Sequence, residues 1–163
     1  MKLFLASAIF ILGCSTLSAQ TREECIKELN KIARKSVNQK FLSGIFYEKA
    51  KLKAQEFSET EISKVVQTRV TMKTRYTNID WNSLSDYSLF NYQSMIVSKD
   101  RNDKLLQLTL KFKKNVKHEY FGADDAGDDD PRTDNEIDEI YILEKYRDDA
   151  EKYVKRLIEL AQE

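Results

Sequence analysis

The chain has 163 residues, and its 27 basic and 27 acidic side chains leave no net charge at pH 7. It contains one histidine, two cysteines and four glycines. A structural zinc site needs more thiolate or imidazole ligands than these. The glycines are not spaced as in a phosphate-binding loop. Zinc binding and nucleotide binding are therefore not expected.

Residues 1–19 have the features of a secretory signal peptide, which is removed from the mature protein. Lys2 provides a positive charge, the run from Leu3 to Leu12 is apolar, and small residues end at Ala19. The apolar run is too short to cross a bilayer as a helix. The mature chain would then be one domain over residues 20–163, which is an ordinary domain size. The ending "LSAQ" resembles that of many small exported proteins of Bacteroidota.

The same segment permits a second interpretation. Ile11-Leu12-Gly13-Cys14 resembles a bacterial lipobox, in which Cys14 would be lipidated and become the N-terminus. A lipid would hold the protein on a membrane, whereas cleavage after Ala19 would release it. We therefore expect a periplasmic or secreted protein, or alternatively an outer-membrane lipoprotein. Membrane contact is expected only if Cys14 is lipidated.

Helical spacing of apolar residues begins directly after the leader. Thr21 and Glu24 have the spacing of a capping box, and they precede a helix predicted over residues 22–40. Its apolar positions are Ile26, Leu29, Ile32, Ala33 and Val37. Cys25 is expected on the apolar face of this helix. Residues 41–57 are ambiguous between helix and strand, and we favour a second helical piece.

From Val66 onward the apolar period changes to two, which predicts strands with one buried and one wet face. One long strand is expected over residues 66–77 and a second over 87–98. The third, over residues 105–113, shows the cleanest alternation. It places Leu106, Leu108, Leu110 and Phe112 inward and Gln107, Thr109, Lys111 and Lys113 outward.

The third strand is expected to continue through Val116, His118 and Tyr120 across a bulge near Lys114-Asn115. A fourth strand carries Ile137, Ile140 and Ile142. The last element is an amphipathic helix, with Asp148 as its N-cap. Its apolar stripe consists of Ala150, Tyr153, Val154, Leu157, Ile158 and Ala161.

These elements predict an α+β fold. An N-terminal helix is followed by an antiparallel sheet of at least four strands, and a C-terminal amphipathic helix packs on the sheet. The order of elements over residues 62–163 resembles the pleckstrin-homology-like architecture, and a cystatin-like or other helix-on-sheet fold fits nearly as well. Such a resemblance concerns the fold and implies no particular function.

Residues 122–139 carry nine acids and one base, whereas the rest of residues 20–163 carries 25 bases and 18 acids. If the third and fourth strands pair, an acidic loop over residues 122–136 joins them. It is interpreted as a solvated loop, as an electrostatic contact with a partner or with the protein's own basic face, or as a calcium site. Calcium prefers carboxylate oxygens, and the candidate ligands are Asp124, Asp128, Asp130 and Asp134. Crowded carboxylates repel one another, and the EF-hand pattern is not matched.

No catalytic residues are assigned. A Ser-His or Cys-His pair would need His118 as its base, and His118 is expected to be an ordinary strand residue. The cluster Lys111, Lys113, Lys114 and Lys117 is typical of the wet face of a strand rather than of a nucleic-acid site. We expect a non-catalytic exported binding or accessory protein of the bacterial envelope. It would contact another protein through the wet sheet face or the acidic loop. The alternative is a calcium-binding protein or a small carboxylate-dependent hydrolase.

Overall fold

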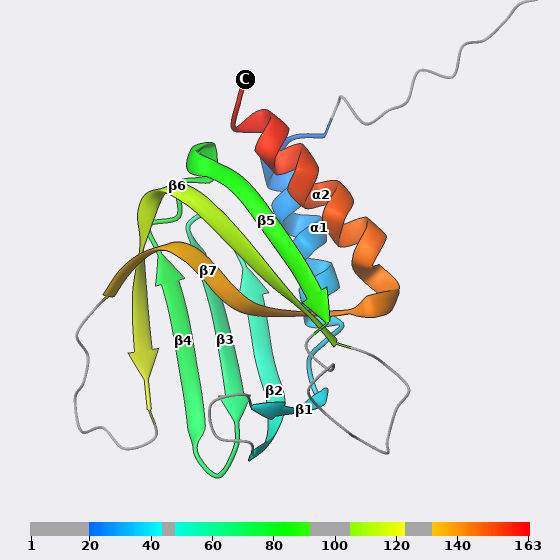
Figure 1. Cartoon of the computed structure of the whole chain (residues 1–163), viewed down its shortest axis with the longest axis vertical. Coiled ribbons are helices and arrows are strands. Elements are labelled where there is room, and N and C mark those ends of the chain that lie inside the picture. The colour runs from blue at the N-terminus through cyan, green and yellow to red at the C-terminus, as the bar shows by residue number, and fades with distance from the viewer. Residues whose placement is uncertain (1–19, 44–47, 92–104, 123–131) are drawn as a thin grey trace, which may run out of the picture.

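The computed structural model describes residues 20–43, 48–91, 105–122 and 132–163. Within them the fold is α+β, as predicted: helix α1 (Arg22–Arg34), an antiparallel seven-stranded sheet, and helix α2 (Arg147–Leu160). Figure 1 shows the sheet curled into a half-barrel with the two helices lying side by side along one flank. Helix α1 packs against α2 and β2, and α2 packs against β5, so the helical pair closes the open side of the curl.

Strand β6 organises the sheet. Its N-terminal half pairs with β5 and its C-terminal end with β4, while β7 pairs along the opposite edge. The order is β1-β2-β3-β4-β6-β5, with β7 attached to β6. The strands are β1 (Lys40–Ser43), β2 (Glu48–Phe57), β3 (Glu61–Gln67), β4 (Thr71–Thr77), β5 (Leu84–Asn91), β6 (Leu105–Phe121) and β7 (Arg132–Leu143).

The predicted capping box of α1 is confirmed, but the predicted end of the helix is wrong. The Thr21 hydroxyl accepts from the Glu24 amide at 3.2 Å, and the Thr21 amide donates to the Glu24 carboxylate at 2.9 Å. The helix ends at Arg34 rather than at Lys40. The chain then turns through Asn38, which has a φ of 74° and donates its amide to the Leu52 carbonyl at 2.7 Å. Asparagine tolerates this left-handed conformation, which directs the chain into β1.

The second helical piece predicted over residues 41–57 is wrong, because β1 and β2 form a hairpin there. The ambiguity of the pattern has a physical cause. Ala50 and Leu52 alternate as a strand requires, but a bulge between Leu52 and Ala54 shifts the register by one residue. Beyond the bulge the inward residues are Gln55 and Phe57. The extra residue thus produces apolar spacings that imitate a helix.

The single strand predicted over residues 66–77 is also wrong. A turn at Thr68 and Val70 splits it into β3 and β4, which pair with each other. The Thr68 amide donates to the Val70 carbonyl at 2.9 Å, and Val70 is 42% exposed at this turn. The next predicted strand, over residues 87–98, corresponds to β5, and residues 92–98 lie outside the described part.

Strand β6 confirms the predicted continuation and its irregularity, since its pairing with β7 shifts register between Lys111 and Val116. The outward assignment of Gln107 and Thr109 is wrong, because both are buried. All six residues from Leu105 to Leu110 are buried, so the N-terminal half of β6 is covered on both faces.

Helix α2 has its predicted apolar stripe, with Ala150, Val154 and Leu157 buried. The predicted N-cap is wrong. A short 3-10 turn, η4 (Glu144–Tyr146), leads directly into the helix, and Tyr146 occupies the cap position without a side-chain hydrogen bond. Asp148 lies in the first turn instead, where a negative charge favours the helix dipole.

Two clusters of buried side chains form the core. The larger cluster joins the helices to the sheet and includes Leu29 and Cys25 of α1, Leu157 of α2 and Ile140 of β7. Burial raises the pKa of the Cys25 thiol, as expected for a side chain that packs as an apolar group. The smaller cluster consists of Phe41, Ala50, Leu52, Val66, Leu105, Tyr141 and Leu143.

A buried side-chain amide connects β2 to β7 across the inside of the curled sheet. Gln55 on β2 is 1% exposed, and its Nε2 donates to the Tyr141 carbonyl at 2.8 Å. Its Oε1 accepts from the Tyr141 amide at 2.9 Å. The side chain therefore pairs with the main chain of β7 as a neighbouring strand would, although β2 and β7 are not neighbours in the sheet. Buried polar main-chain groups need such partners.

Candidate functional site

The structure places only one of the four candidate calcium ligands. Asp134 lies on β7 opposite Val116, where it is exposed, and its Oδ1 accepts from the Glu136 amide at 3.2 Å. The acidic loop predicted to extend to residue 136 is therefore too long, since β7 begins at Arg132. Asp124, Asp128 and Asp130 lie outside the described residues. Among the residues that are described, no group of three or more His, Cys, Asp or Glu side chains could hold a metal ion.

His118 lies on β6 opposite Tyr76 of β4, and the two rings stack with their centroids 4.5 Å apart. The Tyr76 hydroxyl donates to Oδ1 of Asp138 at 3.0 Å. The three side chains link β4, β6 and β7. This arrangement accounts for His118 as a packed strand residue.

A lysine that the sequence reasoning did not single out lies inside the curl. Lys64 is on the inward face of β3, 6% exposed, between Ile62 and Val66. Its Nζ is 5.6 Å from the centroid of the Tyr141 ring. A cation over an aromatic face is stabilised by the quadrupole of the ring. Lys64 and Gln55, both buried inside the curl, thus interact with Tyr141 of the protein's own β7.

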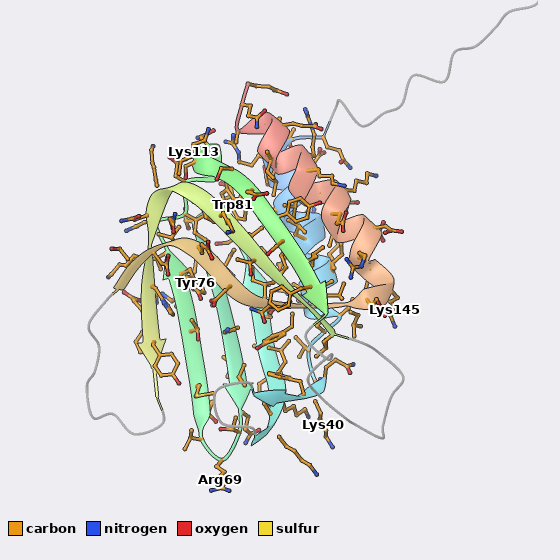
Figure 2. The ribbon with its side chains drawn as sticks, viewed as in Figure 1. Lys40, Arg69, Tyr76, Trp81, Lys113 and Lys145 are labelled. Carbon is orange, nitrogen blue, oxygen red and sulfur yellow. The ribbon has the colours of Figure 1, made fainter. Side chains whose placement is uncertain are left out.

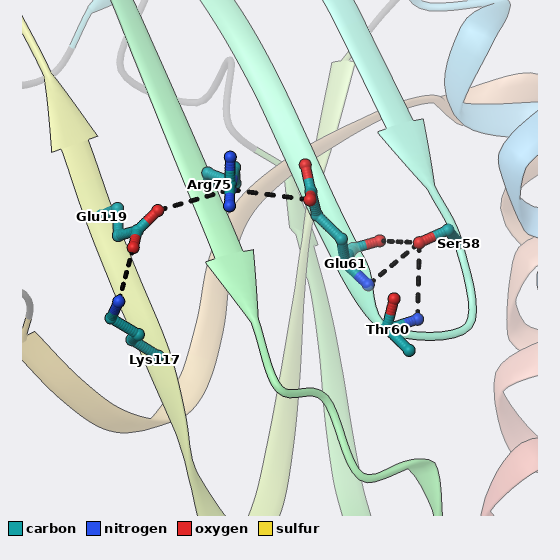
Figure 3. A network of polar contacts seen from close by, with 6 residues as sticks. All are labelled: Ser58, Thr60, Glu61, Arg75, Lys117 and Glu119. Carbon is teal, nitrogen blue, oxygen red and sulfur yellow. Dashed lines mark hydrogen bonds and ion pairs between the residues drawn. The ribbon is translucent and has the colours of Figure 1, made fainter.

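The opposite, outer face of the sheet is exposed, and its strand registers define straight rows of side chains. One row runs Glu56, Ser63, Arg75 and Glu119, and the next runs Glu61, Thr77 and Lys117. We call Glu61, Arg75, Lys117 and Glu119 the paired end. Figure 3 shows their contacts: Arg75 lies 3.5 Å from Glu61 and 3.3 Å from Glu119, and Lys117 lies 2.7 Å from Glu119.

The β2–β3 turn positions the first acid of the paired end. The Ser58 hydroxyl accepts from the Glu61 amide at 2.9 Å and donates to the Glu61 carbonyl at 3.0 Å (Figure 3). At the other side, the hydrogen bond from Lys117 lowers the pKa of the Glu119 carboxyl. Every charge of this group therefore has an opposite charge beside it.

The other two rows of the outer face carry no acid. They run Lys40, Lys51, Gln67, Thr71 and then Ala54, Val65, Lys73, Phe121. Lys49 and Lys53 flank Lys51 along β2. We call Lys40, Lys49, Lys51, Lys53 and Lys73 the lysine end. In Figure 2 Lys40 lies near the tip of the β3–β4 hairpin, marked by Arg69, while Lys113 and Trp81 lie toward the opposite end.

The ammonium groups of the lysine end have no acidic partners in the part of the chain that the structure describes. Lys73 instead lies near an aromatic ring, with its Nζ 5.9 Å from the centroid of Phe121. Lys40 stands directly opposite Lys51 in the β1–β2 register. Like charges opposite each other destabilise a strand pair, so this arrangement costs stability rather than adding to it.

Apolar side chains border the lysine end. Phe121 is 38% exposed at the end of β6, and Val70 is exposed at the tip of the β3–β4 hairpin. Tyr120 is also exposed, opposite Thr74 and so toward the other face. The lysine end is thus a cationic surface with an apolar border.

The sequence reasoning missed the lysine end because it assigned residues 41–57 to a helix. The signal was present in "KAKLKA", where Lys49, Lys51 and Lys53 alternate with Ala50 and Leu52. That period of two is the pattern of a strand with one basic face. It also continues the predicted wet face of the sheet, since Lys51 stands opposite Gln67 of β3.

Comparison with protein-family models, with curated proteins and with solved structures finds no significant match of any of the three kinds. The resemblance to a pleckstrin-homology-like or cystatin-like architecture therefore stays a prediction. Among the described residues there is no helix with the length and apolarity needed to cross a membrane.

Proposed function

We propose that this protein is a non-catalytic, exported binding protein of the bacterial envelope, and that it contacts another protein through the lysine end. One observation carries the proposal: five lysines gather on one exposed part of the sheet, and in the described structure no acid neutralises any of them. Among the described residues, these lysines neither pack in the core nor form ion pairs.

The border of the lysine end supports a protein contact. Aromatic side chains are enriched at the core of protein interfaces, and Phe121 offers its ring beside Lys73. Val70 adds apolar area at the hairpin tip. Lysine charges give an interface orientation and association rate more than affinity. An accessory or adaptor role therefore fits this surface.

The position of the N-terminus is compatible with both interpretations of the leader. Figure 1 shows the start of α1 at the end of the molecule away from the β3–β4 hairpin. If Cys14 were lipidated, the chain from Cys14 to Gln20 would extend at most about 20 Å. The lysine end would then face away from the anchoring membrane. If the leader is cleaved after Ala19, the lysine end is equally accessible.

Affinity purification from the native envelope tests the proposal with two matched variants. The first changes Lys40, Lys49, Lys51 and Lys73 to glutamine. The second, a control with the same change in charge, substitutes glutamine at Lys27, Lys35, Lys145 and Lys152, which are exposed on and beside the helices.

A protein enriched by the wild type and by the control, but lost with the first variant, would support the proposal. Enrichment of the same protein by all three would remove the lysine end from the contact. If the wild type enriched no protein, the binding function itself would be contradicted. Circular dichroism and thermal unfolding of each variant confirm that the fold is intact.

A further inference from the structure

We infer that the partner presents an acidic, extended segment to the lysine end, aligned with strand β2. This inference rests on the proposed function, because it names the chemistry of the surface that the lysine end would contact. It is carried by the rows of the outer face and by the type of basic residue in them.

The charge is arranged along one strand. Lys49 and Lys51 are two residues apart on β2, with the side chains of Ala50 and Leu52 turned inward. Side chains on one face of a strand repeat at about 6.8 Å. An extended partner segment with acids at alternate positions has the same repeat, so consecutive carboxylates would meet consecutive lysines.

Neighbouring strands widen the contact. Lys40 lies opposite Lys51 on β1, about 5 Å away across the strand pair. Lys73 lies two strands away on β4, in the adjoining row with Val65. A segment lying along β2 would therefore have cations on both sides. It would also relieve the repulsion between Lys40 and Lys51, which no acid among the described residues offsets.

The type of basic residue indicates which kind of acidic group the lysine end would bind. The side chain of lysine acts as a point charge on a flexible stem and lacks the planar fork of arginine. Lysines suit a run of carboxylates rather than one fixed planar group. We therefore expect binding that depends on the number of acids and weakens steeply with salt.

An anionic bilayer is the competing occupant of a basic surface. Interfacial membrane binding combines basic residues with several large apolar ones that enter the headgroup region. Among the described residues of the lysine end and its border, the exposed large apolar residues are Val70 and Phe121. A lipid at Cys14 would also hold the opposite end of the molecule to the membrane. The observations therefore favour an acidic protein segment.

Photo-cross-linking in the native envelope tests this inference. Gln67 is exposed in the row between Lys51 and Thr71, so a photoreactive benzoylphenylalanine there samples the lysine end. The same residue in place of Ser88, exposed on β5, is the control. The cross-linked peptide is sequenced by mass spectrometry, with and without added poly-L-glutamate and at low salt and about 0.5 M salt.

We expect the Gln67 position to capture a peptide rich in Asp and Glu, and the yield to fall at least about tenfold with poly-L-glutamate or with salt. The Ser88 position should not capture it. A captured protein segment without an acidic excess would overturn this inference and leave the proposed function standing. A lipid adduct at Gln67 would overturn it in favour of a membrane. If the Gln67 position captured neither a protein nor a lipid, the proposed function would fail as well.

Discussion

The paired end and the lysine end lie on the same face of the same strands, yet their charges are arranged in opposite ways. At the paired end Arg75 stands between two glutamates, and Lys117 closes the row. At the lysine end Lys40 faces Lys51, and neither has an acidic partner in the described residues. A sheet surface needs polar side chains for solubility, but it does not need like charges opposite each other. The proposed contact of the lysine end with a partner rests on this difference.

The inner face of the sheet differs from both ends of the outer face, because its polar side chains are buried. A substitution there should have the largest effect on stability. Replacing Gln55 with leucine would leave the amide and carbonyl of Tyr141 without the partners that now reach them. Buried groups that lose their partners cost about 1–3 kcal/mol each, so we expect a loss of about 2–4 kcal/mol in the free energy of unfolding. Urea denaturation measures it. The control, Gln67→Leu on the outer face, should change stability by less than about 0.5 kcal/mol; equal losses would contradict the role of Gln55.

Removing the central cation of the paired end should have a smaller effect. Arg75→Ala leaves Glu61 and Glu119 without it, but these side chains are partly exposed and screened by water. Exposed ion pairs contribute about 0–1 kcal/mol, so we expect a loss within that range that shrinks at high salt. Denaturation at low and high salt checks this. A loss that salt does not change would mean that Arg75 acts through packing of its stem.

Reversing a charge at the lysine end should increase the stability of the fold, whereas the two substitutions above lower it. Lys51→Glu places an acid opposite Lys40, so a repulsive pair becomes an attractive one. Opposed pairs in a sheet contribute about 0.2–1 kcal/mol, and we expect a gain of about 0.5 kcal/mol together with weaker capture of the partner. Urea denaturation and a quantitative pull-down are the two measurements. A marked loss of stability would show that the fold uses Lys51.

The smallest effect concerns pH. The hydrogen bond from Lys114, 2.7 Å from Oδ2 of Asp80, lowers the pKa of the Asp80 carboxyl below its ordinary value of 3.8. A lowered pKa means that the carboxylate stabilises the fold above that value, and the stabilisation disappears as pH falls through the folded pKa. Lys114→Ala should therefore cost at most about 0.5 kcal/mol at neutral pH. The difference from wild type should vanish in strong acid; a difference constant from pH 7 into acid would exclude Asp80 as its source.

The sequence predicted the α+β class because its helices and β6 have strong periodicity. The capping box at Thr21 and the stripe of α2 are local features, and local features survive in the structure. The errors arose where one or two residues altered the pattern. The bulge at Lys53 gives the apolar residues of β2 a spacing that resembles that of a helix. The turn at Val70 separates β3 from β4, although the alternation of the sequence continues through it.

The candidate site was predicted less well, because it depends on how strands are brought together. No local pattern indicates that Lys40 lies opposite Lys51, or that Lys73 joins them from two strands away. The predicted wet face of the sheet was a correct expectation for Lys111 and Lys113 on β6. Gln107 and Thr109 were also expected on the wet face, but they are buried because the curl of the sheet covers them. Long-range burial of this kind cannot be read from a period of two.

Lysine footprinting in the native envelope tests the central claim most directly. A water-soluble acetylating reagent is applied to the intact envelope and to the purified protein, and mass spectrometry compares the reactivity of each lysine. We predict that Lys40, Lys49, Lys51, Lys53 and Lys73 react more slowly in the envelope, while exposed lysines on and beside the helices, such as Lys27 and Lys152, keep their reactivity. Equal reactivity of the lysine end in both samples would contradict the claim that a partner covers it.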